Sequence, residues 1–291
     1  MQGESTDVSF FSKTPTECPV CSTKFYREEM RTGRGRLIAG KLTRELRRTY
    51  EPSKKYGDVF PLVYPVVVCP SCYYAAFSHD FPAVPADRRQ QLHTDMQQRI
   101  DALTDVLHGI DFTRPRALKE GLASYVLAMM CYDRFPKEFG PTIKQGVSSL
   151  RAAWIAGDLD VREPGKNYDK LAAIFYRKAR FFYALAIEQE QNGSQALPAD
   201  FSPGPDLDKN YGYDGILYIA GLLDWLYGPR KDPQKRRLAL ARSKRSIARI
   251  FGMGRASKDK PAAILDNARD VYEEIANELG LENVDPEQDN E

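Results

Sequence analysis

The chain has 291 residues, 42% of them hydrophobic, so it can bury a substantial core as one large domain or two smaller ones. Its 42 Lys and Arg residues against 40 Asp and Glu residues give a net charge of +2, which excludes a strongly basic nucleic-acid binder on total charge alone. No apolar run approaches the roughly 18 residues of a membrane span and the segment from Met1 to Ser12 lacks a secretory apolar core, so we expect a cytoplasmic protein without membrane insertion.

Residues 1–85 differ from the rest of the chain, because they contain strand-forming runs, prolines and two Cys-Pro-x-Cys pairs. These pairs are Cys18-Pro19-Val20-Cys21 and Cys69-Pro70-Ser71-Cys72. Two such pairs can place four thiolates about 2.3 Å from one zinc ion in a closed structural site. A reducing compartment favours thiolates over disulfides. The pattern therefore predicts a structural Zn²⁺ site formed by Cys18, Cys21, Cys69 and Cys72 at the centre of a small β head that resembles a zinc ribbon.

Three weaker features concern the cysteines and the strand that leads into the second pair. A redox role for either cysteine pair is the lesser alternative, because thioredoxin-like chemistry expects one pair at a strand-to-helix turn. Residues 60–68 are rich in strand formers, and Pro61 and Pro65 favour an edge or irregular strand that leads into Cys69. The fifth cysteine, Cys131, follows an apolar run and is expected to be a buried small hydrophobe without chemistry.

The insert between the two cysteine pairs is basic, with eleven Lys or Arg residues against four acids from Lys24 to Lys55. Such a patch could contact a phosphate backbone, with tyrosines offering stacking faces. A solvated loop or a surface for an acidic partner is the favoured alternative, because the total charge is balanced. The candidate contact residues for nucleic acid or an acidic partner are Arg34, Arg36, Arg44, Arg47 and Arg48.

After the prolines at positions 82 and 85 the apolar spacing changes to the helical period, and we place a domain boundary there. The expected helical domain covers residues 86–280. Its predicted helices are 86–108, 114–134, 140–157, 166–192, 208–228, 231–252 and 259–280. Residues 281–291 carry five acids and no Lys or Arg, and we expect an acidic disordered tail.

The spacing of Ala179, Tyr183 and Ala186 is typical of the second helix of a tetratricopeptide repeat, in which small residues flank a large aromatic one. We therefore expect a mostly α-helical protein built from tetratricopeptide-like hairpins, with a concave groove for a peptide or partner helix. An irregular helical bundle with small residues at close crossings is the alternative.

Several segments together resemble the bacterial domain-of-unknown-function family 2225, over a range from about Glu17 to Leu279. They are Cys18 to Phe25, the strand into Cys69 to Phe77, Asp80-Phe81, Arg151 to Trp154, Ala179 to Glu188, the helix around Tyr218, and Asn267 to Ile275. The resemblance implies a zinc-ribbon head on a helical repeat body with no established activity. Members of that family usually carry glycine after the second cysteine of each knuckle. Ser22 and Tyr73 stand there in this chain, so both are expected at positive φ at a cost on the order of 1 kcal/mol.

No pattern around His79, His93 or His108 builds a catalytic triad or a metal-hydrolase cluster. The sequence therefore favours a non-enzymatic, cytoplasmic scaffold or adaptor that binds an unidentified protein partner through its helical repeats and has no small-molecule substrate. The alternative is a nucleic-acid-binding adaptor that uses the basic insert.

Overall fold

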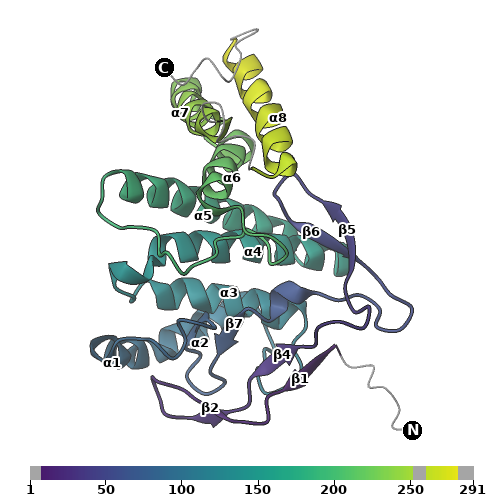
Figure 1. Cartoon of the computed structure of the whole chain (residues 1–291). Helices are drawn as coiled ribbons and strands as arrows, with labels where there is room; N and C mark the ends of the chain where they lie inside the picture. The colour runs from purple at the N-terminus through teal and green to yellow at the C-terminus, as the bar shows by residue number, and fades with distance from the viewer. Residues whose placement is uncertain (1–7, 252–259, 281–291) are drawn as a thin grey trace.

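The computed structural model describes residues 8–251 and 260–280, and this part of the chain is mostly helical with a small N-terminal β region (Figure 1). The acidic tail expected at 281–291 lies outside the described residues. No helix among the described residues combines the length and the apolar character that a membrane crossing needs.

The β region consists of short antiparallel strand pairs rather than one continuous sheet. The pairs are β1 (Ser9–Phe11) with β4 (Glu28–Met30), β2 (Thr16–Glu17) with β3 (Lys24–Phe25), β5 (Ile38–Leu42) with β6 (Arg48–Glu51), and β7 (Val66–Val68) with β8 (Ala75–Phe77). The strand expected over 60–68 is only partly formed. It begins as a 3₁₀ turn, η1 (Pro61–Val63), because Pro61 fixes a helical φ at the first position of that turn, and strand pairing starts after Pro65.

The helices follow the predicted order, and several of them differ from the prediction in extent. They are α1 (Ala86–Thr94), α2 (Met96–Val106), α3 (Leu118–Tyr132), α4 (Pro141–Arg162), α5 (Tyr168–Gln191), α6 (Gly212–Tyr227), α7 (Pro233–Phe251) and α8 (Ala262–Leu279), with a 3₁₀ turn, η2 (Lys137–Phe139), before α4. The helix expected at 86–108 is interrupted at Asp95 and forms α1 and α2. Helix α4 continues past Gly157, because the burial of Leu159 extends its apolar face and offsets the roughly 1 kcal/mol cost of a helical glycine.

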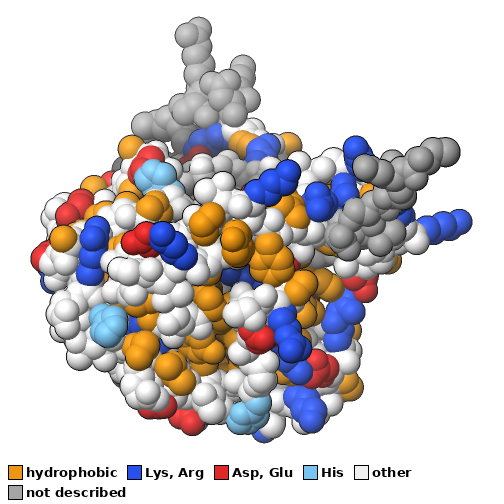
Figure 2. Space-filling view, turned by 90° about the horizontal axis from the view of Figure 1, so that it is seen from below, with side chains coloured by type: hydrophobic (Ala, Val, Ile, Leu, Met, Phe, Trp, Pro, Cys, Tyr) orange, Lys and Arg blue, Asp and Glu red, His pale blue; other side chains and the backbone are white. Residues whose placement is uncertain are grey.

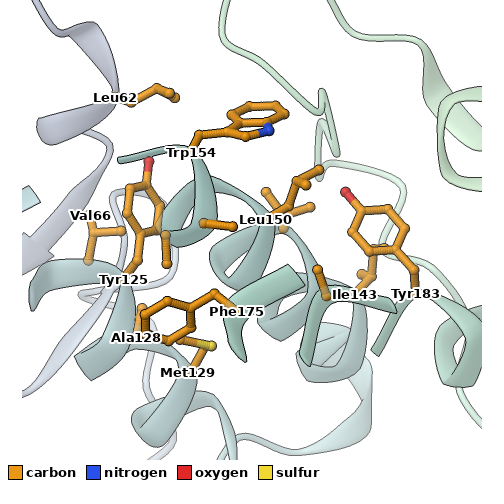
Figure 3. Packing of buried hydrophobic residues seen from close by; sticks show 14 of the residues in the cluster. Leu62, Val66, Tyr125, Ala128, Met129, Ile143, Leu150, Trp154, Phe175 and Tyr183 are labelled. Carbon is orange, nitrogen blue, oxygen red and sulfur yellow. The ribbon is translucent and has the colours of Figure 1, made fainter. Parts of the chain in front are cut away.

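Helices α3, α4 and α5 lie side by side in chain order, and α6, α7 and α8 continue the arrangement toward the C-terminus (Figure 1). Ala179, Tyr183 and Ala186 are all buried on α5, as their spacing predicts. A Cβ atom on Gly146 of α4 would lie 3.0 Å from the Tyr183 ring, so α4 approaches this aromatic closely only because Gly146 has no side chain. Figure 3 shows Tyr183, Ile143 and Leu150 at this contact.

The β region and the helices share one hydrophobic core rather than two separate ones. Leu62 and Val66 pack toward Tyr125 of α3, as Figure 3 shows. Helix α3 meets η1 so closely that a Cβ atom on Gly121 would lie 2.6 Å from Val63. The cysteine-bearing hairpin β7–β8 is therefore anchored on the helical body.

Candidate metal centre

Each Cys-Pro-x-Cys pair forms the turn of a β-hairpin, and the two turns have the same backbone geometry. In the first, the Cys18 N–H donates to the Thr23 carbonyl at 2.9 Å and the Ser22 N–H donates to the Cys18 carbonyl at 2.9 Å. In the second, the Cys69 N–H donates to the Tyr74 carbonyl at 2.9 Å and the Tyr73 N–H donates to the Cys69 carbonyl at 3.0 Å. Both turns thus direct two sulfurs to the same side of a short hairpin.

The residue after the second cysteine has positive φ in both turns, at 60° for Ser22 and 56° for Tyr73. This confirms the backbone conformation expected at these two positions. A non-glycine residue in that conformation costs on the order of 1 kcal/mol, so each turn holds a modest local strain. Positive φ recurs at the same position of both turns, and both turns bring two cysteine sulfurs together.

The four cysteine sulfurs converge, and all of them lie within 4.8 Å of one another. The contacts cross between the two turns, with 3.7 Å from the Cys18 Sγ to the Cys72 Sγ and 3.6 Å from the Cys21 Sγ to the Cys69 Sγ. A disulfide needs about 2.05 Å, so these are separate thiols. Four sulfurs at about 2.3 Å from a central ion are about 3.8 Å apart, and this donor set therefore fits a tetrahedral metal ion.

Burial disfavours several thiolates at this site unless a cation is present. Cys18, Cys69 and Cys72 are at most 1% exposed, and Cys21 is partly exposed. Hydrogen bonds from the Cys18 and Cys72 thiols lower the pKa of Cys69. The hydrogen bond with Cys69, together with burial, raises the pKa of Cys18. Hydrogen bonds with Cys18 and Cys69, together with burial, raise the pKa of Cys72. One thiolate thus forms at the expense of the others, and a divalent ion would remove this competition.

Two residues of the helical body support the second turn. The buried Arg99 of α2 donates from Nη2 to the Cys72 carbonyl at 2.9 Å, which places a positive charge beside the sulfur cluster and partly offsets the charge of a tetrathiolate site. The Cys131 sulfur of α3 accepts from the Ala75 N–H at 3.4 Å, and burial raises the pKa of Cys131 to about 11. Cys131 is therefore a packed thiol outside the cluster.

The contact of Arg99 with the second cysteine turn was not predicted from the sequence, although the position of Arg99 in α2 indicates a buried charge. Arg99 occupies an apolar-face position of α2, three residues after Met96 and four before Leu103, where a charged side chain requires a buried partner. His79, seven residues after Cys72, has a 78% exposed side chain near Asp80 and Asp200 and is not part of the sulfur cluster.

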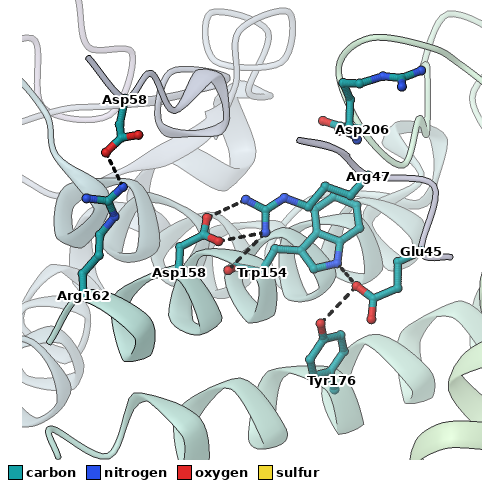
Figure 4. A network of polar contacts seen from close by, with 9 residues as sticks. Glu45, Arg47, Asp58, Trp154, Asp158, Arg162, Tyr176 and Asp206 are labelled. Carbon is teal, nitrogen blue, oxygen red and sulfur yellow. Dashed lines mark hydrogen bonds and ion pairs between the residues drawn. The ribbon is translucent and has the colours of Figure 1, made fainter. Parts of the chain in front are cut away.

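The structure places three of the five candidate contact arginines against the helical body. Arg44 pairs with Glu274 of α8 at 2.5 Å. Arg47 pairs with Asp158 of α4 at 2.5 Å (Figure 4), and Arg48 pairs with Asp208 at 3.1 Å. The β5–β6 hairpin therefore uses these charges to bind the body of its own chain.

The remaining two arginines lie nearer the start of the hairpin. Arg36 is 5% exposed and stacks over the Tyr56 ring at 4.7 Å. Arg34 is exposed in a turn with φ of 55°. The five arginines therefore do not share one surface environment.

Glu45 at the tip of the same hairpin accepts hydrogen bonds from the Trp154 indole N–H and from the Tyr176 hydroxyl (Figure 4). Burial raises the pKa of Glu45. Replacing Glu45 with alanine should lower the free energy of unfolding by about 2 kcal/mol, because both donors lose their acceptor. Glu45→Gln keeps an acceptor and should cost less, and urea titrations of the three proteins measure the difference.

The sign of the pH effect at Glu45 follows from the raised pKa. The folded state holds the proton more tightly than the unfolded state, so this group favours folding at low pH, and its contribution is lost as pH rises through the folded pKa. Glu45→Gln cannot titrate and should lack this component. Parallel pH profiles of stability for the wild type and Glu45→Gln would contradict the assignment.

Comparisons with known proteins cover both the head and the body. A family model described as "Uncharacterized protein conserved in bacteria (DUF2225)" matches residues 11–275. An "Uncharacterized protein" of Borreliella burgdorferi is 43% identical over 272 residues, which are 94% of this chain and 98% of that protein. No solved structure gave a significant match.

Proposed function

The chain belongs to this bacterial family, and on that premise we propose that it is a non-enzymatic cytoplasmic scaffold whose head is stabilised by a structural four-cysteine zinc site and whose helices bind a protein partner. The observation that carries the proposal is the convergence of four cysteine sulfurs, three of them buried, to within 4.8 Å of one another. Four thiolates leave no coordination position for a reactant, so zinc here contributes to folding and not to catalysis.

The helical body supports the scaffold role through its architecture. Consecutive helices pack beside one another, and the buried Ala179, Tyr183 and Ala186 have the spacing of a tetratricopeptide-like repeat. Helical-hairpin stacks of this kind present extended surfaces to peptides and partner helices. We therefore assign partner binding to the repeat-like helical body, against which the head packs.

The nucleic-acid alternative has less support. Arg44, Arg47 and Arg48 form ion pairs with carboxylates of their own chain, which leaves them less available for phosphates. Figure 2 shows the face of β1, β2 and β4, where Lys and Arg side chains are interspersed with Asp and Glu around exposed apolar side chains. Such a mixed surface suits a protein partner better than a phosphate backbone.

The proposal is tested by crosslinking the tagged full-length chain in bacterial cells, purifying it without chelator and identifying what it retains. We expect one protein in a fixed ratio that binds the zinc-loaded chain again when both are purified. Nucleic acid whose retention falls steeply with salt would favour the alternative, and failure of every candidate complex to re-form would overturn the scaffold role. Charge reversal of Arg44, Arg47 and Arg48 is unsuitable for this test, because it also breaks their ion pairs with the body.

A further inference from the structure

A cavity of about 920 Å³ lies beside strand β1. Its walls come from Val8 to Phe11, the segment around Phe60, the first turn of α3 and the end of α4. Aromatic and aliphatic side chains line much of it, with charged groups among them. A cavity of this size can hold several residues of a peptide.

The strand register shows which backbone groups of β1, the strand that lines the cavity, face away from β4. The Arg31 N–H donates to the Val8 carbonyl and the Ser12 N–H donates to the Arg27 carbonyl, so the backbone groups of Val8, Phe10 and Ser12 are directed toward β4. By the alternation of a β-strand, the N–H and C=O groups of Ser9 and Phe11 point away from β4. Within residues 8–251 and 260–280, no strand pairs with that outer edge.

Side chains from both faces of the β1–β4 pair line the cavity. Phe10 stacks under the Arg31 guanidinium on one face, at 4.9 Å from the ring centre. Ser9 lies on the other face, where its hydroxyl donates to Glu28 at 2.5 Å. A ligand can meet both faces of a two-stranded ribbon only along its edge, so the cavity is open to the free backbone groups of β1.

Among the described residues, the cation of the cavity that has no carboxylate partner is Arg31. Lys119 pairs with Glu163 at 2.9 Å, and Arg162 pairs with Asp58 at 2.7 Å. In the described part of the chain, Arg31 forms no ion pair, and its buried Nε has no hydrogen-bond partner. A buried donor of this kind is costly unless a ligand satisfies it, so the cavity has an electrostatic preference for a carboxylate at Arg31.

We propose that this cavity binds an extended segment of a partner protein, which adds to β1 as a third strand and directs an Asp or Glu side chain to Arg31. The proposal rests on the scaffold function and names the site and the class of partner segment. Backbone hydrogen bonds to Ser9 and Phe11 supply affinity, and the carboxylate at Arg31 together with the apolar lining supplies specificity. A small anion would satisfy Arg31 but would leave the free strand edge unused.

The test begins with a displayed library of random ten-residue peptides selected on the zinc-loaded full-length chain, followed by calorimetry on the strongest binder. We expect an Asp or Glu at one fixed position. Its exchange for Asn or Gln should weaken binding at least tenfold, and so should Arg31→Glu in the protein, whereas Arg31→Lys should have a smaller effect. Lys24→Glu makes the same charge change at an exposed head residue outside the cavity and should leave binding unchanged.

Backbone methylation of the synthetic peptide tests strand addition without altering the protein. Two peptides are compared, one with N-methyl groups at its odd-numbered residues and one with N-methyl groups at its even-numbered residues. One of the two should lose binding and the other should keep it, because only one edge of the added strand faces β1. Equal effects in both peptides, insensitivity to Arg31→Glu, or the absence of any enriched peptide would each overturn this site. A selected peptide that ignores Arg31 would still be compatible with a scaffold that binds elsewhere.

Discussion

Replacing Cys69 with serine should abolish zinc binding, unfold the head and reduce the free energy of unfolding by several kcal/mol. The wild type should carry about one zinc ion per chain, and structural zinc contributes on the order of 10 kcal/mol to the folding of small zinc domains. Removing one thiolate opens the tetrahedron and leaves the competing thiols Cys18 and Cys72 in a buried site. Metal analysis of protein purified without chelator, together with urea unfolding, measures both effects.

Cys131→Ser is the matched control, because it makes the same chemical exchange at a buried cysteine outside the cluster. It should retain the full zinc content and lose only local packing around the Ala75 N–H. Cys69 belongs to the core that the head shares with α3, so its loss should also lower the melting temperature of the body. A wild type without metal, or a Cys69→Ser protein with undiminished zinc and stability, would refute the metal assignment.

The parts of the structure that the sequence predicted are those with local causes. The cysteine turns recur because Cys-Pro-x-Cys fixes a short hairpin turn. The positive φ values of Ser22 and Tyr73 were expected from the family resemblance, because relatives usually carry glycine at these positions. Helix order and most helix ends follow from apolar spacing and from Pro and Gly positions. These signals are all contained within windows of about ten residues.

The parts that could not be predicted depend on partners far apart in the chain. The charge surplus of the insert suggested solvent or an external partner, yet Arg44 pairs with Glu274, 230 residues away. A count of neighbouring charges cannot identify such a partner. The same holds for Arg99 at the Cys72 carbonyl, whose role depends on where α2 packs against the second cysteine turn.

Asp80 and Lys144 form a further long-range contact that the sequence did not reveal, and it joins the end of the head to α4. The Lys144 Nζ donates to the Asp80 Oδ2 at 2.6 Å, and the Tyr132 hydroxyl donates to the same oxygen at 2.6 Å. Both charged side chains are only 4% exposed. Lys144 also lies over the rings of Tyr132 and Phe201.

Replacing Lys144 with methionine should therefore lower the free energy of unfolding by about 3–5 kcal/mol, because it leaves the Asp80 carboxylate buried without a cation. Methionine preserves most of the volume and the aromatic contacts, so the loss reports on charge more than on packing. Lys178→Met makes the same exchange at an exposed site on α5 and should change stability by less than about 0.5 kcal/mol. Urea unfolding of the three proteins provides the comparison.

The double variant Asp80→Asn with Lys144→Met separates the cost of an unpaired charge from the value of the pair. A neutral amide can still accept from Tyr132, so the double variant should recover much of the stability that Lys144→Met loses. A double variant as unstable as the sum of its two single variants would show that the residues act independently. Recovery would mean instead that the ion pair aligns the head with α4 while adding little net stability, since desolvation of both charges cancels most of their attraction.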